Sequence, residues 1–245
     1  MAISIKKLNL HIIFLNFVLF INNLLFANDQ SLELARHEFL SGNYDKSINI
    51  AKKIDTIEAK VFQSRAMSVH AHFFLKDEIA KEKFLASYQI MKKLYSETSD
   101  NADIYVEAAH ALGRYGQKIG IMPAITEGIA DRVKKYLDKA LIIDNTNIIA
   151  NLSKGLWHAE IINQAGKTLA KAVYRADAKK ARDHFAKAYN ASNKEISVLY
   201  ELSYGYYLLG NDADIMLSKK YLKHLLSIEG VAHIDKLYKN KAKIL

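Results

Sequence analysis

The chain contains few of the residues that end or bend regular secondary structure. Among its 245 residues there are one proline, Pro123, ten glycines and no cysteine. The absence of cysteine excludes disulfides and reactive thiols. Turns between strands rely largely on glycine and proline, so the scarcity of both residues favours long helices over a sheet.

The abundant residues fit a helical globular domain. Half of the residues are hydrophobic and a quarter are charged, which is typical of a folded rather than a disordered chain. Alanine, leucine, lysine, isoleucine and glutamate recur throughout, and most of them favour helices. No stretch sustains the alternation of polar and apolar residues expected of a half-buried strand. The sequence therefore predicts an all-α protein.

Residues 1–27 have the order of a secretory signal peptide. Two lysines precede an apolar run, Leu8–Phe26, and the small residue Ala27 closes it, which predicts cleavage after Ala27. Residues 28–245 would then form a single domain, and the simplest destination is the periplasm of a Gram-negative bacterium. Asparagines within the run weaken it as a membrane span, but its length would suffice for one. An uncleaved anchor is therefore the alternative, and it would be the chain's only contact with a membrane.

The positive charge of the chain does not indicate a nucleic-acid partner. The net charge is +9, but the lysines are scattered. Aromatic residues are not interleaved with them, as single-strand binding would require. Solvated helix faces account for such charge, and attraction to an anionic surface or partner is the alternative.

The mature chain opens with a helix–turn–helix pattern over residues 32–54. Gly42 is placed to end the first helix in a left-handed conformation, and Tyr44 to pack back across the turn. This segment resembles the tetratricopeptide repeat (TPR), a helical hairpin of about 34 residues. Its small, aromatic and turn positions are matched by Leu34, Ala35, Phe39, Gly42, Asn43, Tyr44 and Ser47.

Further helices are expected along the rest of the chain. Their ranges are Glu58–Leu75, Asp77–Tyr95, Ala102–Ile119, Thr126–Ile143, Asn147–Asn163, Thr168–Tyr174, Lys179–Asn190, Leu199–Leu209 and Ser218–Leu226. Residues 231–245 are expected to form a terminal helix or a frayed tail. Together these elements predict a right-handed superhelical stack of antiparallel helix hairpins, with about 9–11 helices after the signal peptide.

Three connections have features of their own. Gly113–Thr126 contains Pro123 and is expected to be the longest irregular connection, a place where functional residues often gather. Ser192 and Glu195 are spaced as a capping box for the helix that follows. Residues 212–217 are expected to be an insertion that lengthens the turn of the last hairpin.

A second resemblance centres on the only tryptophan. Gly155–Glu160, which contains Trp157, is followed by Leu169, Tyr174 and Ala181–Ala188, and this pattern is similar to a family of exported bacterial TPR-like proteins of undefined role. It is also loosely similar to the regulator of microtubule dynamics proteins. The TPR accessory subunits of tripartite periplasmic transporters share the exported helical-repeat plan. These resemblances imply a scaffold that binds a partner or ligand, not a reaction.

No motif for catalysis, a metal or a cofactor is present. The sequence lacks a zinc-protease motif, a phosphate-binding glycine loop and a nucleophile elbow. His158 and Glu160 point about 200° apart on a helix, so they do not ligate one ion together. His158 is therefore either a packed or capping residue of the core or a contact for a partner.

Two groups of residues are candidates for binding. Glu107, His110 and Arg114 share one helix face, where they either hold an anionic or polar ligand or form an ordinary surface ladder. Tyr200 and Tyr204 belong to a stripe, with Tyr207, that is either core packing or an aromatic wall. Five histidines fall in first helices of the proposed hairpins, which line the concave face of a repeat stack; they are His37, His70, His72, His110 and His158.

These patterns predict a non-catalytic scaffold that binds a protein or peptide on its concave face. The alternative is an accessory protein of a periplasmic transport system that binds a small organic ligand. The candidate contact residues for either function are Glu107, His110, Arg114, His158, Tyr200 and Tyr204.

Overall fold

The structure is a computed structural model that describes residues 28–245; the predicted signal peptide, residues 1–27, lies outside the described part. The regular elements within this part are all helical. Residues 28–40 form a first helical segment, and the elements that follow are α2 (Tyr44–Ala51), α3 (Ile57–Phe74), α4 (Asp77–Glu97), α5 (Ala102–Ile119), α6 (Ile121–Thr126), α7 (Ile129–Ile143), α8 (Ile148–Leu169), the π-helical turn η1 (Ala170–Tyr174), α9 (Ala178–Ala191), α10 (Ile196–Leu209), α11 (Asp212–Ser227) and α12 (His233–Ala242).

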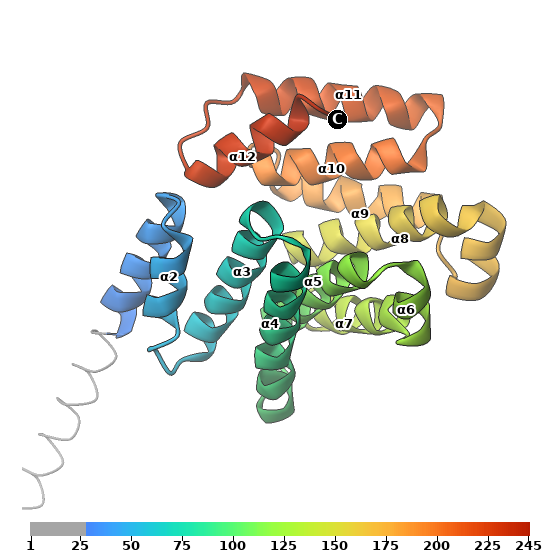
Figure 1. Ribbon diagram of the computed structural model, residues 1–245. Coiled ribbons are helices and arrows are strands. Elements are labelled where there is room, and N and C mark those ends of the chain that lie inside the picture. The colour runs from blue at the N-terminus through green and yellow to red at the C-terminus, as the bar shows by residue number, and fades with distance from the viewer. Residues whose placement is uncertain (1–27) are drawn as a thin grey trace, which may run out of the picture.

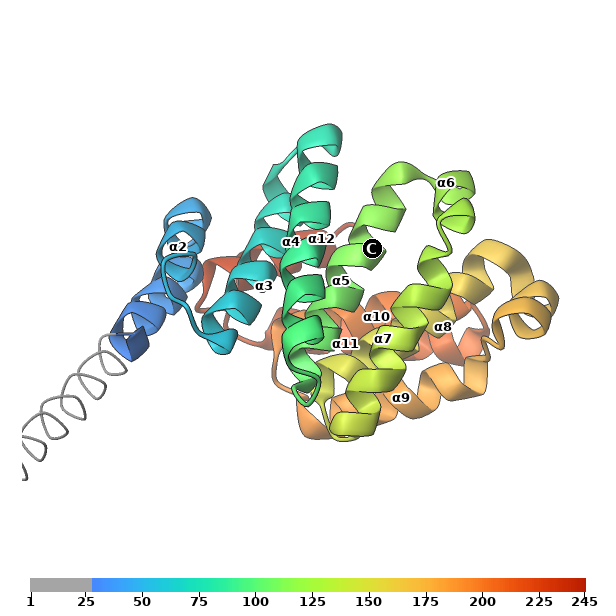
Figure 2. The ribbon, with the colours of Figure 1, turned by 90° about the horizontal axis from the view of Figure 1, so that it is seen from below.

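The helices form a stack of hairpins, as the sequence predicts (Figures 1 and 2). The first helix of each hairpin belongs to one continuous inner layer, because α3 packs on α5, α5 on α8, and α8 on α10. The second helices α4, α7, α9 and α11 each pack against their own first helix and form the outer layer. The prediction of an all-α helical repeat stack is confirmed.

The first hairpin follows its local sequence closely. Gly42 has φ +88°, a conformation that glycine adopts without steric cost. Tyr44 packs back on Phe39, with the ring centroids 5.2 Å apart and the rings nearly perpendicular. Across the hairpin, the Ser47 hydroxyl donates to the Ala35 carbonyl at 2.7 Å. Both roles predicted for Gly42 and Tyr44 are confirmed.

The core is organised around one phenylalanine of α9. Phe185 is fully buried, and its ring lies against Gly155 of α8 and Gly205 of α10. A Cβ atom at either glycine would stand within 2.4 Å of the ring, so only glycine lets the three helices approach this closely. Ala181 and Ala188 of the same helix are also fully buried.

Gly113–Thr126 is not the irregular connection that the sequence predicts. α5 continues to Ile119, Gly120 breaks it with φ +88°, and α6 then begins at once. Pro123 does not prevent this, because it lies in the first turn of α6, where backbone N–H groups have no partner within the helix. With α6 and residues 28–40 counted, the described residues form twelve α-helices, slightly more than predicted.

Two other local predictions are wrong. Ser192 follows the last residue of α9, and its N–H donates back to Ala188, so it does not cap α10. α10 instead begins after Glu195, whose side chain makes no capping hydrogen bond. Residues 212–217 are not an inserted loop, because Asn211 accepts a hydrogen bond from the N–H of Asp214 and starts α11 directly.

The terminal segment is a helix, and it lies across the inner layer. Tyr238 of α12 packs between Phe73 of α3 and Tyr200 of α10, with 5.3 Å between ring centroids in both pairs. At the start of α12, Nδ1 of His233 lies 3.1 Å from the Tyr44 hydroxyl of the first hairpin. The last helix therefore joins α10 to the beginning of the stack (Figure 1).

Within the described part of the chain, no helix is both long enough and apolar enough to cross a bilayer.

Candidate functional site

Glu107 lies beneath the inner face rather than on it. Its side chain is 1% exposed, and its Oε1 accepts a hydrogen bond from Nε of Arg65 on α3 at 2.8 Å. Burial by itself raises the pKa of the Glu107 carboxyl, but the charges of Arg65 and His110 more than offset this and lower the pKa to about 2. The other oxygen, Oε2, is buried without a hydrogen-bond partner among the described residues.

His110 and Arg114 stand above Glu107 on the same face of α5. Nε2 of His110 lies 2.6 Å from the Ser153 hydroxyl of α8. Arg114 contacts Gln117 on its own helix at 3.1 Å and Glu201 of α10 at 3.4 Å. The three residues of the predicted row therefore share one face, but each is bound to a different neighbouring helix.

Tyr204 and Tyr200 join the same region from α10. The Tyr204 hydroxyl donates to Oε1 of Glu160 on α8 at 3.1 Å. Burial raises the pKa of both the Glu160 carboxyl and the Tyr204 hydroxyl, so the tyrosine keeps its proton. Tyr200 is covered by Tyr238 of α12 and takes part in aromatic packing instead of forming an open wall.

His158 belongs to the core and not to this face. It is 2% exposed, and its Nδ1 accepts the backbone N–H of Asp177 at 3.2 Å. Its ring lies near-parallel to that of His184, with centroids 6.2 Å apart. Burial, followed by the nearby charge of Lys154, lowers the pKa of His158 to about 4, so it is neutral at pH 7. Of the two interpretations of His158, the packed and capping residue is the one observed.

These contacts define a polar network on the inner layer, drawn from four successive first helices. Its members are Arg65 of α3; Glu107, His110 and Arg114 of α5; Ser153 and Glu160 of α8; and Glu201 and Tyr204 of α10. Sequence reasoning missed Arg65, Ser153 and Glu201, because their partners are 42 to 87 residues away along the chain.

A lysine of α12, Lys241, lies next to this network and against α3. Lys241 contacts the imidazole of His72 on α3, and its ammonium group stands 4.7 Å from the centre of the Phe73 ring. Burial, together with the charges of Arg114 and Lys241, lowers the pKa of His72 to about 2. Burial also lowers the pKa of Lys241. His72 therefore accepts a hydrogen bond from Lys241 as a neutral ring.

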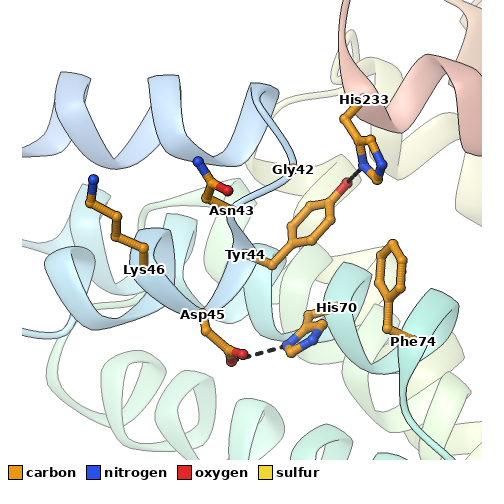
Figure 3. Close-up of a pocket in the computed structure, with 8 residues that line it drawn as sticks. All are labelled: Gly42, Asn43, Tyr44, Asp45, Lys46, His70, Phe74 and His233. Carbon is orange, nitrogen blue, oxygen red and sulfur yellow. Dashed lines mark hydrogen bonds and ion pairs between the residues drawn. The ribbon is translucent and has the colours of Figure 1, made fainter.

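A cavity of about 610 Å³ opens between the first hairpin, α3 and α12 (Figure 3). Its aromatic wall consists of Tyr44, His70, Phe74 and His233, and these rings contact one another at 5.3 to 6.0 Å. Asp45 pairs with Nδ1 of His70 at 3.4 Å. Figure 3 thus shows two polar pairs, Tyr44 with His233 and Asp45 with His70, and the rings hold α12 against the first hairpin. Asn43 and Lys46 bind Glu38 instead.

The predicted gathering of histidines does not form a metal site. Among residues 28–245, no three histidine, aspartate or glutamate side chains are placed to hold a metal ion. His110 lies on the polar network, His72 is under α12, His70 is in the cavity, and His158 is in the core. What the polar network offers chemically is a row of hydrogen-bonding and charged groups on one face.

Among the comparisons with known proteins, the one with solved structures identifies the fold. No family model and no curated protein matches the chain. The chain is similar to the crystal structure of a thermophilic TPR protein from Thermus thermophilus, with a TM-score of 0.64 and 13% sequence identity over 89% of this chain and all of the other. The chain therefore has a TPR-like fold.

Proposed function

We propose that the chain is a non-catalytic scaffold that binds a protein or peptide partner along the inner face of its helical stack. The observation that supports this proposal is the polar network, which draws side chains from α3, α5, α8 and α10 onto one layer. Arg65, His110 and Arg114 keep 42%, 36% and 31% of their side-chain surface exposed, so these three residues are available for contact.

The dimensions of the network favour an extended partner. Packed helices lie about 8–10 Å apart, so a row over four neighbouring helices extends for roughly 25 Å. A peptide or a protein loop covers that length, whereas a small organic molecule does not. The network offers both charges and hydroxyl groups, which suits a polar segment of a partner rather than an apolar one.

A small organic ligand is less well supported. The small-ligand hypothesis depends on two features of the sequence, the row of Glu107, His110 and Arg114 and an irregular segment at Gly113–Thr126. That segment is helical, and the carboxylate of Glu107 is 1% exposed and pairs with Arg65 through Oε1. We therefore retain the scaffold and not the transport accessory protein.

The proposal includes export to the periplasm of a Gram-negative bacterium, with cleavage after Ala27. It is supported by the order of charged, apolar and small residues in positions 1–27. Cell fractionation followed by amino-terminal sequencing tests it directly. A periplasmic product that begins at Asn28 is the expected result. A full-length protein in the membrane fraction would show instead that residues 1–27 are kept as a membrane anchor.

Site-specific photocrosslinking in the native cell tests partner binding. A photoreactive phenylalanine at position 110 is expected to capture one discrete partner, and the same probe at position 135, exposed on the outer helix α7, is expected to capture none. Arg114→Ala or Tyr204→Ala, combined with the probe at position 110, should abolish the captured species. Identical products from both probe positions, or capture that survives both substitutions, would refute binding at the polar network.

A further inference from the structure

Two short helical insertions interrupt the hairpin series at one end of the molecule. α6 separates α5 from α7, and the kinked end of α8 together with η1 separates α8 from α9. Both insertions lie on the right-hand side of the molecule in Figures 1 and 2, with the second insertion at its edge. Neither is needed to pair a first helix with its second helix, and π-helical turns such as η1 occur frequently at functional sites.

Both insertions expose large apolar side chains. Met122 and Ile125 of α6 are 71% and 54% exposed, and Leu169 and Val173 of the second insertion are 53% and 59% exposed. Single exposed apolar residues are ordinary on a protein surface. A group of them at one end of a molecule indicates a site that interacts with another protein or with a membrane.

The second insertion also carries unpaired positive charge. Lys167, Lys171 and Arg175 are exposed, and residues 163–176 contain no aspartate or glutamate. None of the three cations takes part in an ion pair among the described residues. The nearest acidic residue along the chain, Asp177, accepts the backbone N–H groups of Lys179 and Lys180 at the start of α9.

The spacing of these residues gives the insertion two distinct flanks. Ala170 is buried and faces the protein, which sets the orientation of the segment. Leu169 and Val173 are four residues apart and so share one flank. Lys167 and Lys171 are also four residues apart and share the other flank, and Arg175 follows directly after η1 with φ +57°. An apolar row and a basic row therefore run side by side on the outside of the molecule.

We infer that the second insertion docks on an anionic lipid bilayer; we call its outer side the insertion surface, and it consists of Lys167, Leu169, Lys171, Val173 and Arg175. Apolar side chains of this size enter the boundary between headgroups and acyl chains, while lysine and arginine extend their charges to lipid phosphates. The net charge of +9 adds a long-range attraction to a negative surface.

The charge pattern favours lipid over a protein partner. A protein interface usually combines cations with carboxylates that select one partner, whereas residues 163–176 present cations alone. A bilayer with anionic headgroups needs no such selection. The contact is separate from the polar network and from residues 1–27, so it brings the scaffold to a membrane whether or not the amino-terminal segment is removed.

A local fluorescent probe tests the docking, and the absence of native cysteine makes the labelling specific. Full-length protein with Val173→Cys is labelled with an environment-sensitive nitrobenzoxadiazole dye. It is mixed with vesicles of phosphatidylcholine alone or of phosphatidylcholine with phosphatidylglycerol. We expect a blue shift and a rise in emission with the anionic vesicles only. Met216→Cys on α11, where the native side chain is 72% exposed, is the control and should show no change.

Charge variants separate specific docking from general attraction. In the labelled Val173→Cys protein, the triple substitution Lys167→Gln, Lys171→Gln and Arg175→Gln should weaken the response to anionic vesicles by about tenfold or more, because each basic group near the surface contributes to binding. The matched triple Lys219→Gln, Lys220→Gln and Lys223→Gln on α11 removes the same charge from exposed positions and should leave the response largely intact.

The contradicting outcomes are distinct. No response at position 173 with anionic vesicles would overturn the proposal, as would equal responses at positions 173 and 216. Equal losses from the two triple variants would mean that net charge alone drives the attraction. A response at position 173 to a soluble protein but not to lipid would assign the insertion surface to a protein partner instead.

Discussion

Arg65 and Glu107 form an ion pair that joins α3 to α5 beneath the inner face, with Nε of the arginine 2.8 Å from Oε1 of the glutamate. The carboxylate is almost completely buried, whereas 42% of the arginine side chain is exposed. Removing the arginine would leave a buried charge without its partner, so the pair constrains the position of α5, which carries three residues of the polar network.

We expect Arg65→Met to lower the free energy of unfolding by about 2–3 kcal/mol, somewhat less than for a fully buried pair because the arginine is partly solvated. Urea denaturation of the wild type and the variant measures this. Combining Arg65→Met with Glu107→Leu should recover most of the loss, because the buried charge is then gone. A single variant as stable as the wild type would show that the pair contributes nothing.

The same pair predicts an unusual dependence on pH. The folded pKa of Glu107 is lowered to about 2, so its stabilising contribution is complete above the ordinary pKa of a glutamate and is lost as the pH falls through the folded value. In Arg65→Met the largest cause that lowers the pKa of this carboxyl is gone, so burial, opposed only by His110, raises the pKa relative to the wild type. Protonation of Glu107 then removes the buried charge that has lost its partner. The stability deficit of Arg65→Met relative to the wild type should therefore shrink when the pH is lowered from about 7 to 5.

Urea midpoints at the two pH values measure this change. Glu107→Gln, which has no charge to titrate at that position, serves as the reference. A deficit of Arg65→Met that is the same at both pH values would show that Glu107 is not the titrating group.

The contact of Phe185 with two glycines gives a prediction for the core. In Gly205→Ala the new Cβ would lie 2.3 Å from Cζ of Phe185, which is fully buried. We expect a loss of about 1–3 kcal/mol from overpacking, despite the better helix propensity of alanine. Adding Phe185→Leu should reduce the penalty of the alanine. Gly113→Ala, where the nearest atom is 3.9 Å away, is the control and should be neutral or stabilising in thermal denaturation.

The position of α12 predicts its dynamics. Tyr238→Ala removes two aromatic contacts, each worth about 0.5–1.5 kcal/mol beyond the area that it buries. Amide hydrogen exchange in α12 should become faster, while exchange in α4, which takes part in none of the aromatic contacts of α12, should be unchanged. Lys236→Ala, at an exposed position of the same helix, is the matched control. Unchanged protection in Tyr238→Ala would mean that other contacts hold α12 in place.

Elements with strong local signals could be predicted from the sequence. α5 has the predicted bounds, Ala102–Ile119, because Asn101 accepts the N–H of Asp103 at its start and Gly120 ends it. The predictions were wrong where one local sequence pattern is compatible with two different structures. Pro123 ends a helix in its interior but is tolerated in a first turn, and only the path of the chain after Gly120 decides between them.

The candidate site could be predicted only in part. Helical spacing correctly put Glu107, His110 and Arg114 on one face and separated His158 from Glu160. It did not predict that Glu107 is buried, because burial depends on what covers a face and not on the face itself. It also did not predict the partners of the row, which come from three other helices.

The sequence by itself determined the helical class, the hairpin order and the faces that side chains share, because these follow from residue spacing and from caps within a few positions. Only the tertiary structure decided which faces became core, which charges were paired and where the last helix came to rest. α12 contains no local signal for its contacts with Phe73 and Tyr44, which lie far away along the chain. Those contacts arise because the chain after α11 turns back and places α12 across the inner layer. That path depends on how all the preceding helices are packed, which no single segment encodes.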